Sequence, residues 1–414
     1  MSKLTVAVIA ALDTKGAEAG FVRSIIEGRG YDCILIDVGV LGPPSTNASV
    51  SRAVIAQAGG DPLEQLQIRG DKAHAMDVMT RGAAIIAAQL FAERKLHAIV
   101  GIGGTAGTAI ATSAMRTIPI GIPKVMVSTV AAGDTRPYVG TKDITMMYSI
   151  VDIAGINRIS SKILANAAGA AIGMLETSFE FESTRPIIAA SMFGNTTPCI
   201  DRARALLTSA GFEVLVFHAT GVGGATMESL VQDGLVDGLL DLTTTEWADE
   251  LCGGVFSAGP HRLEAAAKSG TPQIVAPGCL DMVNFAGPET VPTRYAARKL
   301  YRWNANVTLM RTDIEENLRL GKIFADKLND ASGPVKVLIP LRGLSQLDSE
   351  GREFWWPEAD HALFSSVKRH LRADIPVLEL DCNINDPMFA DAAVKSLGEL
   401  MTQAPHTRTQ PSIH

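Results

Sequence analysis

Short apolar runs of strand length alternate along the chain with segments whose apolar residues recur at helical spacing. Thr5–Ala11, Cys33–Asp37 and Lys124–Ser128 are runs of the first kind, and Lys72–Arg94 is a long segment of the second. Strands that are mostly apolar and separated by helices are typical of parallel βαβ units. Because the crossovers of such units are right-handed, the pattern predicts a doubly wound, mostly parallel sheet flanked by helices.

The pattern breaks over residues 177–186, where the sequence reads TSFEFESTRP. A second series of strands and helices starts at Ile187–Ser191 and repeats the order of elements of the first series. We therefore expect an α/β chain of two domains, followed by a polar, proline-containing tail that is flexible. The expected bounds are residues 1–180 and 181–402 for the domains and 403–414 for the tail.

Composition and charge narrow the class of protein. Its 414 residues are enough for two or three domains. Asp and Glu outnumber Lys and Arg by 44 to 37, so we expect neither a nucleic acid nor a membrane surface as partner. The first apolar run, Leu4–Leu12, leads into a helical pattern, as a buried strand does and a signal peptide does not. Five scattered cysteines without a CxxC pair favour reduced thiols and a cytoplasmic location.

A glycine-rich loop gives the strongest local indication of a ligand. The sequence GIGGTAGT, residues 101–108, follows an expected strand and opens an expected helix. Glycines let a ligand approach the backbone, and a helix N-terminus offers free N–H groups to an anion. The loop is not a P-loop, because no Gly-Lys-Ser/Thr follows, and it matches the dinucleotide pattern only loosely. The expected phosphate or carboxylate contacts are Gly103, Gly104, Thr105, Gly107 and Thr108, and a tight turn with close helix packing is the alternative.

Two more polar loops follow expected strands and should reach the same edge of the sheet. The first supplies Asp13, Thr14 and Lys15 as expected cofactor contacts, of which Lys15 suits a phosphate and Asp13 suits Mg²⁺. A helix cap is the alternative role for Asp13 or Thr14. The second loop spans residues 128–140, and a surface excursion is its alternative reading. From these loops and the turn at residues 38–42 we take Ser128, Thr129 and Gly39 as further cofactor contacts and Asp134 as a second candidate metal ligand.

The second half of the chain has weaker candidates. His261 and Arg262 precede an expected helix and suit anion binding or proton transfer, although a lone His at a helix start is commonly a surface or capping residue. Asn284 and Arg342 follow other expected strands. The sequence has no HxxxH or HExxH spacing for a metal and no GxSxG for a hydrolase serine.

Seven motifs together resemble a known family. They are LDTKG from residue 12, VGVLG from 38, the glycine loop, STVA from 128, VAPGCLD from 275, VTLMRT from 307 and IPLRG from 339. In this order they are similar to the bacterial and fungal family related to the ATP-binding N-terminal region of the tomato mosaic virus resistance protein. The resemblance spans about residues 3–402. It implies two Rossmann-like domains, ATP binding in the first of them, and a homodimer or higher homo-oligomer.

The leading hypothesis is a protein that binds ATP and Mg²⁺ at the carboxyl edge of the N-terminal sheet. The C-terminal domain would supply a second, small-molecule site across an interdomain cleft, with His261, Arg262, Asn284 and Arg342. Phosphoryl transfer or ligation to a small acid would suit that arrangement. A non-catalytic nucleotide sensor, a nicotinamide-cofactor enzyme and a sugar-phosphate-binding enzyme are the alternatives. The sequence leaves open whether the protein is an enzyme.

Overall fold

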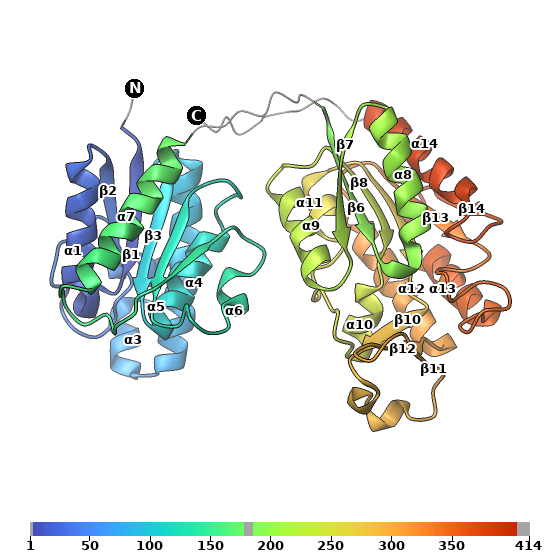
Figure 1. Cartoon of the computed structure of the whole chain (residues 1–414), viewed down its shortest axis with the longest axis horizontal. Coiled ribbons are helices and arrows are strands. Elements are labelled where there is room, and N and C mark those ends of the chain that lie inside the picture. Colours follow the sequence, from blue (N-terminus) through green and yellow to red (C-terminus); the bar gives the residue numbers. More distant parts are fainter. Residues whose placement is uncertain (1–2, 178–184, 404–414) are drawn as a thin grey trace. The chain divides into compact units, whose positions relative to one another are not determined.

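The computed structural model describes residues 3–177 and 185–403, in two compact units that divide the chain between residues 181 and 182. Each unit is a parallel sheet flanked by helices, which confirms the predicted α/β class with two Rossmann-like domains (Figure 1). The boundary expected after residue 180 lies outside the described residues. So does the expected tail, apart from Gln403, which ends a helix.

The N-terminal unit has a five-stranded sheet in the order β2-β1-β3-β4-β5, and all neighbouring strands are parallel. Its strands are β1 (Thr5–Ala10), β2 (Asp32–Asp37), β3 (Ala98–Gly103), β4 (Lys124–Ser128) and β5 (Thr145–Tyr148). Its helices are α1 (Leu12–Gly28), α2 (Arg52–Ala58), α3 (Leu63–Arg69), α4 (Lys72–Ala92), α5 (Thr105–Arg116), α6 (Arg136–Val139) and α7 (Ser160–Glu176).

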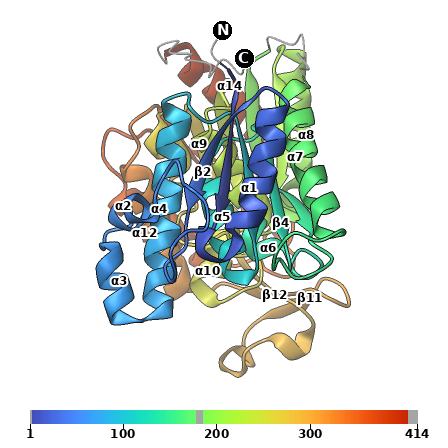
Figure 2. The same ribbon diagram turned by 90° about the vertical axis from the view of Figure 1, so that its left-hand side faces the viewer.

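Alternate side chains of these strands build two cores, one on each face of the sheet. Val6, Val8 and Val100 pack with α1 and α7 on one face, while Ala7 and Ile99 pack with α2, α4 and α5 on the other. Figure 1 shows α1 and α7 together on their face, and Figure 2 shows α2, α3 and α4 gathered beside β2. Both faces are covered, so only the two ends of the sheet are free to meet a ligand.

The direction in which successive strands are added to this sheet changes once, and this change defines a switch point at the carboxyl edge. The chain runs from β1 outward to β2, and then crosses to β3 on the other side of β1. Ligands of open α/β sheets bind at such a switch point. Helix α1 begins at Leu12, so the LDTKG segment, which was expected to be a polar loop, is its first turn. Lys15, at φ −127°, interrupts the helical geometry there.

Helix α4 is, within the described ranges, the one helix long and apolar enough to cross a membrane by length and composition. One side of it packs against α2 and α5, with Val78, Met79 and Ala83 buried, and Ile85 is 51% exposed.

The C-terminal unit has a six-stranded parallel sheet in the order β14-β13-β9-β8-β6-β7. Its strands are β6 (Ile187–Met192), β7 (Glu213–His218), β8 (Gly238–Thr243), β9 (Gln273–Gly278), β13 (Val335–Pro340) and β14 (Val377–Leu380). Its helices are α8 (Thr197–Ser209), α9 (Val222–Gln232), α10 (Glu246–Cys252), α11 (Ala265–Ser269), α12 (Ile314–Asn329), α13 (Pro357–His370) and α14 (Pro387–Gln403), with 3-10 turns η1 (Gly194–Thr196), η2 (Pro288–Thr290) and η3 (Thr293–Tyr295).

Core clusters on both faces again separate the helices of this unit, and α9 and α11 pack in a further cluster with Ala189 and Leu239. α8 and α14 cover the face formed by Ile274, Ala276 and Leu338, and α10, α12 and α13 pack on Val275 and Val337 of the opposite face. Figure 1 shows α8 beside α14 and α12 beside α13.

A small antiparallel sheet is inserted between β9 and α12 and was not predicted. It contains β10 (Met282–Phe285), β12 (Thr308–Arg311) and β11 (Leu300–Arg302), in that order. β12 lies between the other two and is antiparallel to both. Its three or four residues per strand are too short to give a readable period in the sequence.

Candidate functional site

The glycine loop between β3 and α5 contains glycines of two kinds. A Cβ built on Gly103 would lie 2.7 Å from the Cα of Gly107, and one on Gly101 would lie 2.4 Å from the sulfur of Met126. These two positions need glycine for close packing. At Gly104 the nearest atom to such a Cβ is Oγ1 of Thr129, at 3.6 Å, and φ is −80°. Gly104 therefore has ordinary geometry and room for a side chain, so its surface is open to a ligand.

Backbone N–H groups at the start of α5 are the donors of this loop. Gly104 caps the helix without a side-chain hydrogen bond, and its carbonyl accepts the N–H of Thr108 at 2.8 Å. The preceding N–H groups, of residues 105–107, have no acceptor within the helix. Thr105 and Ala106 are exposed. The end of a twelve-residue helix with such donors attracts an anion.

Two hydroxyls expected to bind the ligand are used inside the protein. Oγ1 of Thr108 and Oγ of Ser128 lie 2.7 Å apart, and both side chains are buried. Ser128 Oγ also accepts the N–H of Val130 at 3.1 Å. Thr108 and Ser128 thus hold the ends of β3 and β4 together, while Thr105 and the half-buried Thr129 keep hydroxyls at the surface of the loop.

Asp13 holds the neighbouring loop in place. Its carboxylate is 5% exposed, accepts the N–H of Leu41 at 3.0 Å and lies 3.5 Å from Nη1 of Arg52. Gly39 packs against it, because a Cβ on Gly39 would lie 2.6 Å from Asp13 Oδ1. Arg52 also binds Asp37, with 2.6 Å between Nε and Oδ2. A metal ion at Asp13 would have to share its carboxylate with these partners.

The remaining N-terminal candidates lie around this edge. Nζ of Lys15 donates to the carbonyl of Ile153, and the buried Glu18 accepts the N–H of Gly155 at 2.6 Å, so α1 fixes the loop after β5. Thr14 is exposed. Asp134 is also exposed and accepts two hydrogen bonds from the side chain of Arg136, at 2.9 and 2.8 Å, which lower its pKa to about 2.

No group of three or more His, Cys, Asp or Glu side chains is arranged to hold a metal ion in the part of the chain that the structure describes. Asp13 and Asp134 share no contact there. A Mg²⁺ ion at this edge would therefore take most of its ligands from phosphate oxygens and water, as Mg²⁺ commonly does.

A buried arginine and three carboxylates fill the switch point of the C-terminal sheet, where β8 follows β7 on the far side of β6. Nε of Arg262 donates to Glu246 at 2.6 Å. Nη1 donates to Glu228 at 3.0 Å and also to Asp241, and Nη2 donates to Asp241 at 2.6 Å and to the carbonyl of Thr243 at 3.5 Å. We call this set the Arg262 cluster: Arg262, Glu228, Asp241 and Glu246.

The carboxylates of the Arg262 cluster are anchored by backbone N–H groups. Glu246 accepts those of Gly221 and Gly224 at 2.8 and 3.1 Å, and Glu228 accepts those of residues 263 and 265, both at 2.7 Å. Burial raises the pKa of Glu228 and of Glu246, against the opposing charge of Arg262. Every guanidinium N–H has an acceptor, so the structure assigns Arg262 to holding the fold together and leaves it no donor for a ligand.

His261 and Asn284 lie apart from one another. The side chain of His261 is 82% exposed, and its Nδ1 lies 3.1 Å from Glu264, whose pKa is held at about 2 chiefly by Lys268 and Lys327. Asn284 is buried in β10 and donates through Nδ2 to Asp249 at 2.9 Å. Burial raises the pKa of Asp249 to about 7. Among the described contacts, none joins His261, Asn284 and Arg342 in one site.

A second buried arginine lies beside the small antiparallel sheet. Arg311 donates to Asp360 through Nη2 and to the carbonyl of Phe354 through Nε, at 2.8 Å for the latter, and lies 3.6 Å from Asp348. Asp348 accepts the N–H of Leu344 at 2.9 Å, and Asp281 accepts the hydroxyl of Ser345 at 2.8 Å. Burial raises the pKa of all three carboxyls. We call this set the Arg311 cluster: Arg311, Asp281, Asp348 and Asp360.

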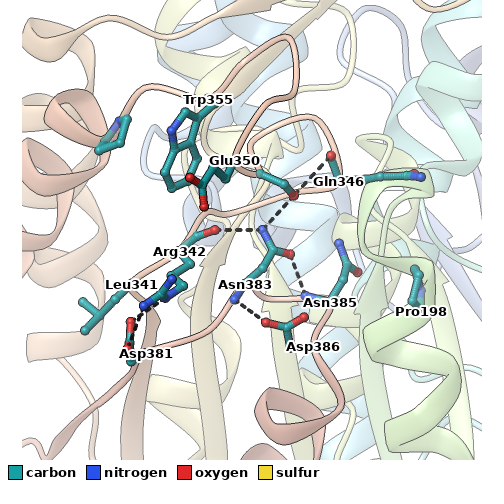
Figure 3. Close-up of a pocket in the computed structure, with 12 residues that line it drawn as sticks. Pro198, Leu341, Arg342, Gln346, Glu350, Trp355, Asp381, Asn383, Asn385 and Asp386 are labelled. Atoms are coloured by element: carbon teal, nitrogen blue, oxygen red, sulfur yellow. Dashed lines mark hydrogen bonds and ion pairs between the residues drawn. The ribbon is translucent and has the colours of Figure 1, made fainter.

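Arg342 lines a cavity of about 750 Å³ at the carboxyl ends of β13 and β14 (Figure 3). Most of the cavity's residues were missed in the sequence. They come from the segments after the two strands and from the starts of α8 and α13: Pro198, Leu341, Gln346, Ser349, Glu350, Trp355, Pro357, Asp381, Asn383, Asn385 and Asp386. The run DCNIND after β14 was an available indication, because Asn and Asp that directly follow a strand lie at the ligand edge.

Two family models match the chain. They are the N-terminal domain of the uncharacterised protein family UPF0261, over residues 4–180, and the C-terminal domain of that family, over 185–401. A UPF0261 protein of Clostridium tetani is 50% identical over 396 residues, which are 95% of this chain and 98% of that protein. The ToMV resistance protein Tm-1(GCR237) of Solanum lycopersicum is 43% identical over 330 residues, 77% of this chain and 44% of that protein, which confirms the resemblance drawn from the motifs.

Solved structures are similar only at the level of general architecture. MurG of Acinetobacter baumannii aligns over 97% of this chain and 98% of its own at 11% identity, with a TM-score of 0.22. A likeness this weak carries no argument about ligand or activity.

Proposed function

The chain belongs to the UPF0261 family, and from that premise we propose that it binds ATP with Mg²⁺ at the carboxyl edge of the N-terminal sheet. The observation that carries the proposal is the uncapped start of α5 beside the open surface of Gly104. It lies next to the β1–β3 switch point, where an open α/β sheet binds its ligand. The resemblance of the motifs to a family for which ATP binding is implied supports ATP as the anion bound there.

The phosphates would accept the N–H groups of residues 105–107 and the hydroxyls of Thr105 and Thr129. Lys15 would add positive charge, since its bond to the Ile153 carbonyl uses one of three N–H donors. Gly103, Thr108 and Ser128 would act by shaping the loop, and Asp13 by holding residues 39–42 beside it. Mg²⁺ would bind the phosphates and reach the protein through water or through Asp134.

Bound ATP supplies an activated phosphoryl group, and the residues named here would position it and stabilise its charge. We propose phosphoryl transfer or ligation to a small molecule, an acid in the first instance, as the activity of a cytoplasmic homo-oligomer. A sensor that binds ATP without turnover is the competing proposal. A nicotinamide cofactor or a sugar phosphate at the same loop is a further alternative.

Isothermal titration with ATP, with and without Mg²⁺, tests the proposal. We expect Mg²⁺-dependent binding by the wild type and at least a tenfold loss in Gly104→Val, whose side chain fills the open surface without backbone strain. Gly169→Val is the matched control, because Gly169 is exposed on α7 with nothing within 4 Å of a built Cβ. Equal binding by Gly104→Val and the wild type would remove the nucleotide from this loop.

Further titrations separate the alternatives at the same loop. NADH or a sugar phosphate that binds where ATP does not would replace the ATP proposal. If ATP binds, phosphate release in the presence of candidate acids distinguishes the enzyme from the sensor: turnover that Gly104→Val abolishes supports an enzyme, and tight binding without turnover supports a sensor.

A further inference from the structure

The cavity at β13 and β14 has a frame that the protein builds before any ligand arrives. Nδ2 of Asn383 lies 3.1 to 3.2 Å from the carbonyls of Arg342, Ser345 and Asp348 and 3.1 Å from Oγ of Ser349. Gly343, at φ +111°, makes this loop turn, since a Cβ there would lie 1.6 Å from the Asp348 carbonyl. The loop after β13 is thus folded onto the segment after β14, as Figure 3 shows.

A third segment completes this frame. The carbonyl of Asn195, in the turn after β6, accepts the N–H of Gln346 at 3.0 Å and Nδ2 of Asn385 at 2.9 Å. Asn195 itself is buried. The walls of the cavity therefore come from three places in the sequence and are joined by hydrogen bonds that leave the side chains of Gln346 and Glu350 unused.

Polar groups on the wall are mostly hydrogen-bond acceptors. The Glu350 carboxylate acts on Arg342 through its charge, with no hydrogen bond or ion pair among the described contacts. The buried Oδ1 of Asn385 has no partner within the described structure. Asp386 uses one oxygen, Oδ2, for the N–H of Asn383 at 2.8 Å. The available donors are those of Gln346, the indole N–H of Trp355, the second Nδ2 hydrogen of Asn385 and part of Arg342. A ligand must bring O–H or N–H donors of its own to satisfy such a wall.

The negative charge of the cavity wall disfavours phosphates and carboxylates as ligands of this cavity. Asp381 holds Arg342 through two bonds, at 2.7 and 3.0 Å, and neutralises it. The carboxylates of Glu350 and Asp386 remain, which leaves the cavity with an excess of negative charge. A second anion would be repelled, whereas a hydroxyl can donate to a carboxylate and accept from an amide in the same contact.

Apolar surface completes the wall. Trp355, half-buried, lines the cavity together with Pro198, Pro357 and Leu341. Aromatic and proline faces pack well against the C–H face of a saturated ring, while the acceptors around them meet the ring hydroxyls. We propose that this cavity binds a neutral, hydroxyl-rich ring, a monosaccharide or a cyclic polyol. The inference concerns binding alone and stands whether or not ATP binds to the N-terminal unit.

Saturation-transfer NMR on the full chain, with unphosphorylated hexoses, pentoses and inositol as probes, tests the proposal. We expect at least one neutral probe to bind, its glucuronate-type acid and its phosphate ester to bind at least tenfold more weakly, and Glu350→Gln to weaken the neutral probe at least threefold. Because Glu350 is exposed and unpaired within the described residues, Glu350→Gln keeps the fold. Trp355→Ala should weaken binding at least tenfold.

Trp303→Ala is the control, because Trp303 is 44% exposed and is not among the cavity's residues. It should bind the neutral probe as the wild type does. An amino sugar is added as a cationic probe. The proposal is overturned if no neutral probe binds, or if the acid, the phosphate ester or the amino sugar binds tighter than the neutral sugar. It is also overturned if Glu350→Gln and Trp355→Ala both bind as Trp303→Ala does.

Discussion

The two sheets obey the same topological rule, and their switch points nevertheless differ. The switch point between β1 and β3 is bordered by the glycine loop, whose N–H donors have no acceptor within the helix. The switch point between β6 and β8 is filled by the Arg262 cluster, which is buried and whose guanidinium donors are all hydrogen-bonded. The open cavity of the C-terminal unit lies at β13 and β14 instead. The strand order of a sheet defines the edge at which a ligand can bind. The volume and charge of the side chains at that edge determine which part of it is accessible.

Removal of the Arg262 charge should have the largest effect. Arg262→Met leaves three buried carboxylates without a counter-charge, which should lower the free energy of unfolding of the C-terminal unit by about 3 to 5 kcal/mol. All four tryptophans lie after residue 182, so their fluorescence during urea denaturation reports on this unit. Arg342→Met, the same change at an arginine that is 58% exposed, should leave the transition nearly unmoved. Equal shifts in both variants would contradict a structural role for the cluster.

Alanine substitution at two adjacent glycines of the N-terminal loop should show which glycine is required for close packing and which has room for a side chain. Gly103→Ala places Cβ 2.7 Å from the Cα of Gly107 and should cost about 1 to 3 kcal/mol, because backbone must move. Gly104→Ala meets nothing closer than 3.6 Å and should be neutral or stabilising by about 0.5 kcal/mol. Far-UV circular dichroism during thermal unfolding measures both. The interpretation fails if Gly104→Ala is the more destabilising.

Buried carboxyls of the C-terminal unit and ion-paired carboxyls of the N-terminal unit should respond to pH with opposite sign. In the C-terminal unit burial raises the pKa of Asp249 to about 7 and of Asp360 to about 8, so the folded state binds protons that the unfolded state releases near pH 4. That stability is present below pH 4 and is lost as pH rises to about 8. In the N-terminal unit the pKa of Asp134 and of Asp143 is lowered, by Arg136 and by Lys124 respectively, so their contribution is lost only as pH falls below about 4.

Tryptophan fluorescence should therefore show the C-terminal unit losing about 1 to 3 kcal/mol between pH 5 and pH 8.5. Asp360→Asn, which cannot ionise, should flatten that dependence. A wild-type profile that rises over this range would show that the buried carboxyls are charged throughout.

Loss of one hydroxyl should have the smallest effect. Thr105→Val keeps the shape of the exposed first residue of α5 and removes a donor, so ATP binding should weaken about three- to tenfold, the worth of one hydrogen bond of about 1 kcal/mol. Thr14→Val is the control, because Thr14 is also exposed and its hydroxyl makes only a 3.4 Å contact with the Ala11 carbonyl. Titration calorimetry compares the two, and equal weakening would place the phosphates nearer to α1.

The regular parts of the fold were predictable because their patterns are local. The strand predicted over Lys124–Ser128 was found over those residues, and the helix predicted to open in the glycine loop begins there, at Thr105. The LDTKG segment was expected to be a loop because its residues are mostly polar. It forms the first turn of α1, which packs through Leu12 and Gly16. The short antiparallel sheet was missed because three-residue strands have no period to read.

The roles of individual site residues were predictable only in part. The glycine loop was found from its composition and its place after a strand, but the difference between Gly103 and Gly104 depends on Gly107 and Thr129. Arg262 was expected to bind a ligand because a charged residue before a helix is usually exposed. Its three partners, at residues 228, 241 and 246, are brought to it by three different elements.

Four features could be predicted from the amino-acid sequence alone: the α/β class, the two-part organisation, the family and the edge of the N-terminal sheet at which polar loops gather. These follow from periodicity and from residues adjacent in the chain. The buried arginine, the open glycine and the position of the C-terminal cavity could be identified only in the folded chain. Burial and charge compensation depend on side chains that meet across distances of tens of residues, and no local pattern records whether a charged group will find its partner.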